Sequence, residues 1–205
     1  MDSLWLTGQA DTSGWLSGTN MLTEIDYRNA AATLGVEVAC VKAVTKVESC
    51  GSGFLPSGEP KILFERHWMY KLLKAKTGKE PTLSEVCDPK AGGYLGGAAE
   101  HVRLAKAVAI DRECALQSAS WGLFQIMGFH WKALGYASVQ AFINDQYASE
   151  GKQLGTFVKF VQINPGMLAA LRAKDWAKFA KLYNGPEYIK NNYHTKLALA
   201  YASFT

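Results

Sequence analysis

One carboxyl group stands where the sequence pattern makes a charge costly. Glu48 follows Val41 and Val44 at the i, i+3, i+7 spacing of one helix face, so it continues the apolar stripe of a helix expected over residues 37–48. Burial and the negative end of the helix dipole near Gly51 both disfavour the carboxylate, and both raise the pKa of Glu48. Cleavage of a glycosidic bond requires such a proton-holding acid. From this helix alone, a helix-ending glutamate turned toward solvent is the alternative.

A second acidic candidate is Glu65, in the run ILFERH. Glycoside hydrolysis usually needs a second carboxylate, and the distance between the two carboxyl groups separates inverting from retaining enzymes. Two interpretations of Glu65 stay open. Its carboxylate activates water or stabilises the oxocarbenium-like transition state, or it is a buried group that ties a loop to Arg66 or His67. Phe64, beside it, is a candidate for substrate contact.

The run SASWGLFQIMG, residues 118–128, contains side chains suited to sugar binding. Gly122 permits close backbone approach, and Gln125 offers both a donor and an acceptor for acetamido and hydroxyl groups. Trp121 and Phe124 are candidates for stacking on sugar faces. For each of these aromatic residues, burial in the core is the alternative interpretation.

Two further segments supply candidates for substrate binding. In LYNGP, residues 182–186, Tyr183 and Asn184 end a helix, although Asn-Gly is also simply a good helix stop. KAGGYLGG, residues 90–97, has glycines but lacks the Lys-Ser/Thr ending of a phosphate-binding loop. We interpret it as a loop that lines a cleft with Tyr94.

Taken together, these motifs resemble a known group of enzymes. KVESCGSGF, SASWGLFQIMG and LYNGP recur in this order in lysozyme-superfamily muramidases and lytic transglycosylases. The run ESCGSGFLPSGEPKILFERHWMYK, followed by SASWGLFQIMGFHW, resembles the phage N-acetylmuramidase family of endolysins. The resemblance covers roughly residues 22–204, which is practically the whole domain.

The resemblance implies a predominantly α, lysozyme-like fold with a small β-hairpin, and Glu48 at the position of the family's catalytic glutamate. It implies hydrolysis of the β-1,4 bond between N-acetylmuramic acid and N-acetylglucosamine in peptidoglycan, with no metal and no other cofactor. It also places residues 118–128 along the glycan cleft. Tyr183 and Asn184 match the tyrosine-containing motif that borders the cleft in lytic transglycosylases.

Two other functions are compatible with the sequence. A lytic transglycosylase would use Glu48 first as acid and then as base while the substrate's own hydroxyl closes an anhydro ring. A non-catalytic wall-binding or membrane-disrupting protein would use the cleft for glycan and basic helices for anionic surfaces. Retention of Glu48 argues against this last function.

Capping signals and apolar periodicity predict most helices. Thr23 with Asp26 resembles a capping box for a helix through Leu34, and Gly35 supplies its stop. The segment from Arg112 to Ile126 is expected to be a buried helix that enters a turn, and the small β element is expected after Glu48. Other expected helices cover residues 66–77, 100–111, 139–148, 151–163, 167–173, 175–183 and 191–203.

The 205 residues suit a single domain, which we expect over residues 22–205 with a flexible extension over residues 1–21. The N-terminal residues lack a basic region followed by an apolar core, so we expect no signal peptide. The expected site of synthesis is the host cytoplasm, with action in the periplasm after holin-type release. Four cysteines without metal-site spacing are interpreted as free, mostly buried thiols: Cys40, Cys50, Cys87 and Cys114.

Positive charge gathers in the C-terminal part. From Gly151 onward eight cations oppose two anions, a net charge of +6. Lys174, Lys178 and Lys181 have the spacing of one exposed helical stripe. We expect such a stripe to attract anionic outer-membrane lipopolysaccharide rather than nucleic acid, in a protein that is a monomer. A merely solvated helical face is the alternative.

Overall fold

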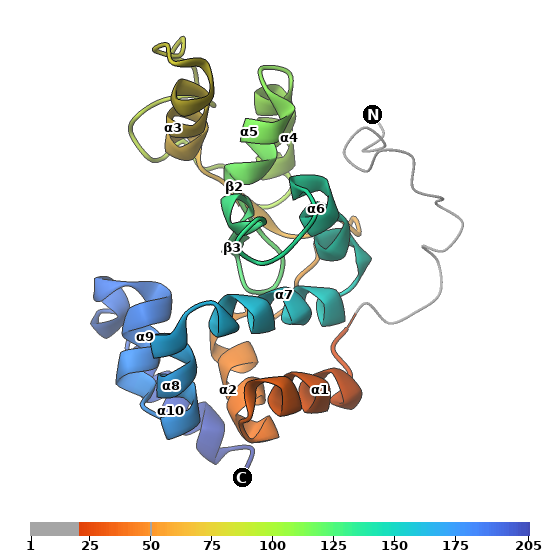
Figure 1. The fold of residues 1–205 in the computed structure, drawn as a ribbon, viewed down its shortest axis with the longest axis vertical. Helices are drawn as coiled ribbons and strands as arrows, with labels where there is room; N and C mark the ends of the chain where they lie inside the picture. The colour runs from red at the N-terminus through yellow and green to blue at the C-terminus, as the bar shows by residue number, and fades with distance from the viewer. Residues whose placement is uncertain (1–20, 50) are drawn as a thin grey trace.

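The computed structural model describes residues 21–49 and 51–205, and within them the chain forms two groups of helices joined by a long middle helix (Figure 1). Most of the predicted N-terminal extension, and Cys50, lie outside the described residues. Among the described helices, none is both long enough and apolar enough to cross a membrane.

The lower group of helices in Figure 1 packs α2 against the C-terminal part of the chain, with α10 lying against both α2 and α9. A capping box joins Thr23 and Asp26 at the start of its first helix, and Gly35 ends that helix with φ 64°, as predicted. We call this group the lower lobe. Its helices are α1 (Glu24–Leu34), α2 (Val38–Glu48), α8 (Pro165–Ala173), α9 (Trp176–Asn184) and α10 (Tyr193–Ala202).

The upper lobe combines three helices with a small antiparallel sheet of order β1-β2-β3. Ile62 pairs with Trp121 and Ser120 pairs with Met127, so the sheet joins segments about sixty residues apart in the chain. The elements of this lobe are β1 (Ile62–Phe64), α3 (Arg66–Thr77), α4 (Ala99–Val108), α5 (Arg112–Gln117), β2 (Ala119–Trp121) and β3 (Ile126–Met127).

The single buried helix predicted from Arg112 to Ile126 is wrong in its second half. Helix α5 ends at Gln117, and the chain continues as the hairpin β2–β3. Its turn needs two residues with positive φ, 70° at Gly122 and 48° at Gln125, which a right-handed helix cannot contain. After Glu48, as expected, the chain is irregular, with an isolated bridge between Phe54 and Pro60 before β1.

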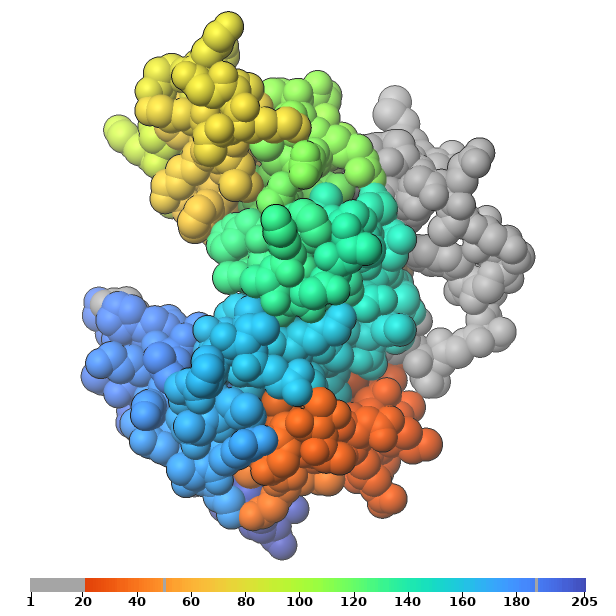
Figure 2. Space-filling model, in the orientation of Figure 1, coloured from red at the N-terminus to blue at the C-terminus, as the bar shows by residue number. Residues whose placement is uncertain are grey.

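Helix α7 (Glu150–Gln162) runs across the middle of the molecule and contacts α1, α6 and α8. It follows α6 (Val139–Ala148), while short 3-10 turns η3 (Gly128–His130) and η4 (Pro186–Ile189) complete the chain. The outline in Figure 2 is indented between the yellow α3 region and the blue C-terminal helices. The predominantly α, lysozyme-like fold with a small β-hairpin is confirmed, and the other predicted helices are present within a few residues.

Candidate active site

Glu48 is the last residue of α2, as the helix prediction required. Val41 and Val44, on the same face, are fully buried, while Glu48 itself is half-buried. Loss of hydration raises the pKa of its carboxyl, whereas a hydrogen bond from Asn184 and the charge of Lys196 act in the opposite direction, and the net pKa lies above the ordinary value. Asn184 Nδ2 donates to Glu48 Oε1 over 2.9 Å. The pKa of Glu48 is therefore shifted in the direction that a proton-holding acid needs.

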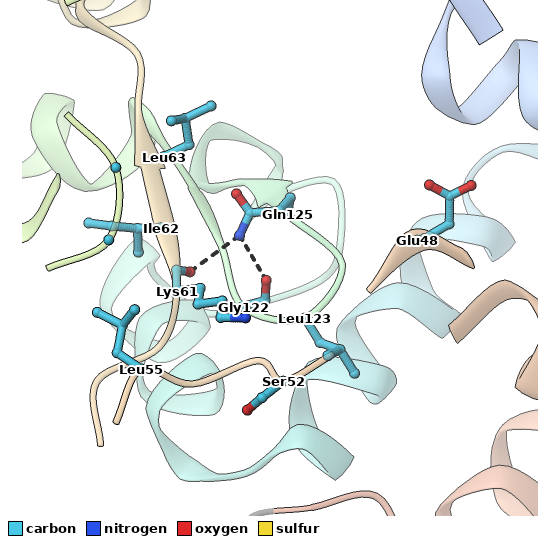
Figure 3. A pocket seen from close by; sticks show the side chains of 11 residues that line it. Glu48, Ser52, Leu55, Lys61, Ile62, Leu63, Gly122, Leu123 and Gln125 are labelled. Atoms are coloured by element: carbon cyan, nitrogen blue, oxygen red, sulfur yellow. Dashed lines mark hydrogen bonds between the residues drawn. The ribbon is translucent and has the colours of Figure 1, made fainter. Parts of the chain in front are cut away.

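A cavity of about 330 Å³ opens beside this carboxyl (Figure 3). The loop after α2, strand β1, the glycine-rich loop before α4 and the turn of the hairpin form its walls. Of the described residues that line it, only Glu48 carries a carboxyl. The lining residues are Glu48, Ser52, Leu55, Lys61, Ile62, Leu63, Gly96, Gly97, Gly122, Leu123 and Gln125.

Gln125, a predicted substrate contact, lines the cavity, and its side chain also holds the hairpin turn. Its Nε2 donates to the carbonyl oxygens of Lys61, over 3.3 Å, and Gly122, over 2.8 Å. Its Oε1 accepts from the Ser120 hydroxyl over 2.8 Å. Both amide protons are used, and the oxygen keeps one lone pair. Gln125 can thus accept one hydrogen bond from a substrate but has no free proton to donate.

Tyr183 and Asn184, at the end of α9, serve the site in different ways. Asn184 contacts Glu48 directly. The Tyr183 hydroxyl instead donates to the Phe124 carbonyl over 2.8 Å, which ties the hairpin of the upper lobe to the lower lobe. Burial, and then the charge of Glu48, raises the pKa of Tyr183 well above its ordinary value. Tyr183 therefore stays a neutral donor.

Three aromatic side chains predicted to contact substrate are buried in the core instead. Phe64 is 0%, Trp121 1% and Phe124 4% exposed. Trp121 Nε1 donates to the Leu116 carbonyl over 3.1 Å, and the Phe124 ring stacks on Phe157 with centroids 4.5 Å apart. Stacking of sugars on Trp121 and Phe124, and substrate contact by Phe64, are therefore wrong. The hydrophobic effect favours burial of these large rings, and all three belong to the apolar core.

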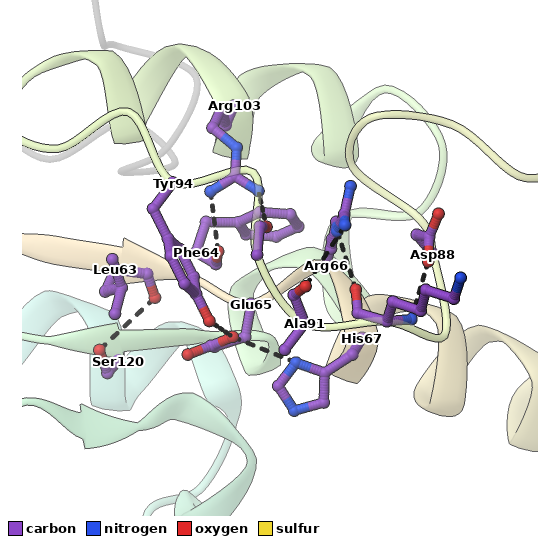
Figure 4. Close-up of polar contacts among 12 residues, drawn as sticks. Leu63, Phe64, Glu65, Arg66, His67, Asp88, Ala91, Tyr94, Arg103 and Ser120 are labelled. Atoms are coloured by element: carbon purple, nitrogen blue, oxygen red, sulfur yellow. Dashed lines mark hydrogen bonds and ion pairs between the residues drawn. The ribbon is translucent and has the colours of Figure 1, made fainter.

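Glu65 caps the start of α3 and does not line the cavity beside Glu48. Its Oε2 accepts from the Tyr94 hydroxyl over 2.8 Å and lies 3.1 Å from His67 Nδ1 (Figure 4). Arg66 donates to the carbonyl oxygens of Lys90 and Ala91 in the same loop. These contacts favour the second interpretation of Glu65, in which it ties the glycine-rich loop to α3.

The same loop is held from its other side by a buried ion pair that the sequence analysis missed. Glu100 is 0% and Arg103 2% exposed, and their charged groups are 2.7 Å apart. The Glu100 carboxylate also accepts from the backbone N–H groups of Phe64, Leu95 and Gly96. Its i, i+3 spacing to Arg103 was the available signal, but it does not reveal burial.

The predicted stripe of three lysines is not continuous. Lys174 is the C-terminal cap of α8, where its ammonium contacts the Glu37 carboxylate and the Tyr201 hydroxyl. Lys178 and Lys181 are exposed on α9. Cys40, Cys87 and Cys114 are buried free thiols.

Comparisons with known proteins agree with this geometry. Residues 37–205 match the family model described as Muramidase, N-acetylmuramidase. Among solved structures, the crystal structure of the Burkholderia AP3 phage endolysin is similar, with 49% sequence identity and a TM-score of 0.84. That similarity covers 94% of this chain and 74% of the other. No curated protein matches the chain.

Proposed function

Since the chain belongs to the N-acetylmuramidase family, we propose that Glu48 is the general acid that protonates the leaving oxygen of the glycan bond. The protein is a glycoside hydrolase whose substrate is bacterial peptidoglycan. As in the similar Burkholderia phage protein, its role is that of an endolysin, which causes lysis of the host cell. The bond cleaved is the β-1,4 bond after N-acetylmuramic acid.

A single observation carries the assignment of Glu48. Its half-buried carboxyl lines the cavity and has a raised pKa. A carboxyl in this state holds its proton until a developing alkoxide needs it. Among the described residues, Asn184 donates a hydrogen bond to one oxygen of the Glu48 carboxyl. This bond orients the carboxyl and leaves its other oxygen for the substrate.

The contacts of Glu65 support a structural role for it rather than that of a second catalytic carboxylate. In this proposal Glu65 and Tyr94 hold the loop whose glycines Gly96 and Gly97 form one wall of the cavity. Gln125, through its free lone pair, accepts a hydrogen bond from an acetamido N–H or a hydroxyl of the glycan. Asn184 completes the set of polar groups around the reacting bond.

The proposal extends to the protein's partners and its location. Lys178 and Lys181 suit attraction to anionic lipopolysaccharide, because exposed cations act over about a Debye length, near 8 Å at physiological salt. The protein is proposed to act as a monomer. Synthesis in the host cytoplasm followed by holin-type release to the periplasm would bring it to its substrate.

Mass spectrometry of the muropeptides released from purified sacculi tests the proposed reaction. Hydrolysis leaves a reducing N-acetylmuramic acid end. Transglycosylation gives an anhydro end with the mass of one water less, and a predominance of such products would refute hydrolysis. Reducing ends on N-acetylglucosamine would refute the choice of bond.

A further inference from the structure

The first turn of α7 carries two polar side chains that are almost fully buried behind the cavity. Glu150 is 5% and Gln153 1% exposed. Burial of a carboxylate and an amide costs free energy unless hydrogen bonds compensate it. The partners of these two groups therefore show what the burial achieves.

Glu150 holds the loop that follows Glu48. Its Oε1 accepts from the backbone N–H of Gly53 over 2.7 Å and from the Ser52 hydroxyl over 3.1 Å. Its other oxygen accepts from the N–H of Leu22 over 3.2 Å. Three neutral donors thus compensate the carboxylate, and two of them belong to the wall of the cavity four and five residues after Glu48.

Gln153 holds the opposite wall, at the hairpin turn. Its Oε1 accepts from the Leu123 N–H over 2.7 Å, and its Nε2 donates to the Gln146 carbonyl over 2.8 Å. The amide is wedged between the two walls, because a Cβ atom placed on Gly53 would lie 2.0 Å from Gln153 Oε1. A Cβ atom on Gly122 would lie 2.6 Å from Gln153 Cδ.

The two walls are also joined through the backbone of Lys61, which lines the cavity. The Lys61 N–H donates to the Gly53 carbonyl, and its carbonyl accepts from the Gly122 N–H, both over 2.8 Å. Figure 3 shows Ser52, Lys61 and Gly122 around the cavity, with Glu48 at its edge. The loop after Glu48 is therefore fixed by Glu150, the hairpin turn by Gln153, and both by Lys61.

We propose that Glu150 and Gln153 are positioning residues, which fix the separation of the two cavity walls and so place the Glu48 carboxyl relative to the bound glycan. The inference rests on the proposed role of Glu48 as general acid. A displacement of about 1 Å in such an arrangement costs up to about 100-fold in rate. Neither side chain is required to touch the substrate.

The first experiment replaces Gln153 by Met, which is close in size but neither donates to Gln146 nor accepts from Leu123. The measurements are kcat, KM and the pH profile on a soluble glycan oligomer, with the melting temperature. In assays at temperatures well below the melting temperature, we expect kcat to fall by at least about 10-fold. We also expect the alkaline limit of activity to move to lower pH, because looser walls hydrate Glu48 and lower its pKa.

Gln162→Met is the matched control, since Gln162 is an exposed residue at the end of the same helix. It should leave kcat and the pH profile unchanged. If Gln153→Met lowers only the melting temperature and keeps the wild-type kcat and pH profile, Gln153 is merely structural and the inference fails.

A double-mutant cycle tests the close packing of the Gln153 amide against Gly53 even if Gln153→Met folds poorly. Gly53→Ala alone should lower kcat strongly, because its methyl group displaces the Gln153 amide from Leu123. Gln153→Ala removes the closest contact of that methyl group and leaves Leu123 N at 3.1 Å, so the double variant should be impaired less than the two single effects added together. Additive effects would overturn the proposed geometry.

Hydrogen exchange of the Gly53 and Leu123 amides separates this inference from the proposed function. Glu150→Ala should expose the Gly53 amide to faster exchange, and Gln153→Met the Leu123 amide, whether or not the protein cleaves glycan. If exchange rates stay at wild-type values, the positioning contacts do not exist in solution and the inference fails. If exchange responds as expected but Glu48→Gln retains activity, it is the role of Glu48 that is wrong.

Discussion

Two glutamates differ in the direction of their pKa shifts: Glu48 lines the cavity, whereas the more deeply buried Glu100, which holds the glycine-rich loop, is the stronger acid. Burial raises the pKa of Glu100, but N–H groups of Gly96, Leu95 and Phe64 and the Arg103 guanidinium more than offset this effect, so its pKa lies below the ordinary value. Half-buried Glu48 has the hydrogen bond from Asn184 and a raised pKa.

The number of donors, rather than burial alone, therefore decides which carboxyl keeps its proton. A carboxylate surrounded by four donors is a fixed structural anion, suited to holding a loop. A carboxyl that has one donor and lies beside a cavity keeps its proton to higher pH and is suited to acid catalysis. The variants of Glu48, Arg103 and Asn184 test this distinction, whereas those of Glu65 and of the α9 lysines test a neighbouring loop and an exposed surface.

The largest effect is expected for Glu48→Gln, which removes the proton donor but keeps the size of the side chain. Lytic activity on purified peptidoglycan should fall by at least about 100-fold, the lower range for loss of a general acid. Residual activity above about a tenth of wild type would contradict the assignment.

The same variant should not lose stability at neutral pH. A raised pKa means that the folded state binds the proton more tightly than the unfolded state, so wild-type stability decreases as pH rises through the folded pKa of Glu48. Gln lacks this dependence. Melting temperatures of both proteins between pH 4 and pH 8, compared by calorimetry, should therefore shift in favour of the variant as pH rises.

Arg103→Met should affect stability more than chemistry, because it leaves the Glu100 carboxylate buried without its cation. Breaking a buried pair costs about 3–5 kcal/mol, which corresponds to a melting temperature lower by on the order of 10 °C in a protein of this size. In the wild type, the stabilisation from Glu100 should be lost as pH falls through its lowered pKa. An unchanged melting temperature would show that the pair does not hold the loop.

Glu65→Gln distinguishes the two interpretations of that residue. Because the amide oxygen can still accept from Tyr94, we expect activity to fall by less than about 10-fold and the melting temperature to fall by a few degrees. Tyr94→Phe, which removes this hydrogen bond altogether, should lower the melting temperature by at least as much. A severe loss of activity at an unchanged melting temperature would instead make Glu65 the second catalytic carboxylate.

Asn184→Ala should move the alkaline limit of activity upward by about one pH unit. The Asn184 amide stabilises the Glu48 carboxylate, and loss of a hydrogen bond to a charged group corresponds to about 1.5 kcal/mol. Asn191→Ala, at a nearby exposed position, is the control that should leave the pH profile unchanged. A downward shift would mean that Asn184 does not favour the ionised form.

The smallest effect is expected for Lys178→Gln combined with Lys181→Gln. These exposed lysines should speed association with anionic surfaces, so killing of Gram-negative cells should slow a few-fold at low salt and approach wild type as salt rises. Lys174→Gln, whose lysine is engaged with Glu37, should instead affect mainly stability. If the double variant kills cells as fast as wild type at low ionic strength, the two lysines only make the surface more soluble and the prediction is wrong.

Helices and the catalytic candidate followed from local patterns, because capping and apolar periodicity are encoded within a few residues of one another. Thr23, Gly35 and the Val41–Val44–Glu48 stripe are examples. A small β element was expected, but not the hairpin β2–β3 at this position, because strands of two and three residues are too short for a period-2 pattern to emerge. Trp121 and Phe124 were misplaced for the same reason, since without the strand direction their inward orientation is not visible.

The polar residues that build the cavity could not be recognised from local patterns. Glu100 and Glu150 both stand in first turns of helices, where a glutamate is ordinarily an exposed partner of the helix dipole. Their burial depends on loops from other parts of the chain. Residues 92–96 pack on Glu100, and residues 51–53 pack on Glu150. Only tertiary structure distinguishes such anchors from surface charges.

The packing of α10 against α2 also bears on how the protein acquires its activity during synthesis. Helix α2 carries Glu48, but it is covered by the helix made more than 140 residues later, and Asn184 reaches Glu48 from a position 136 residues along the chain. Contacts of such long range form late and slow the folding of a domain. A chain without its last helices thus lacks both the packing against α2 and the Asn184 contact that orients the Glu48 carboxyl. We therefore expect lytic activity only from a chain whose C-terminal helices have folded onto α2.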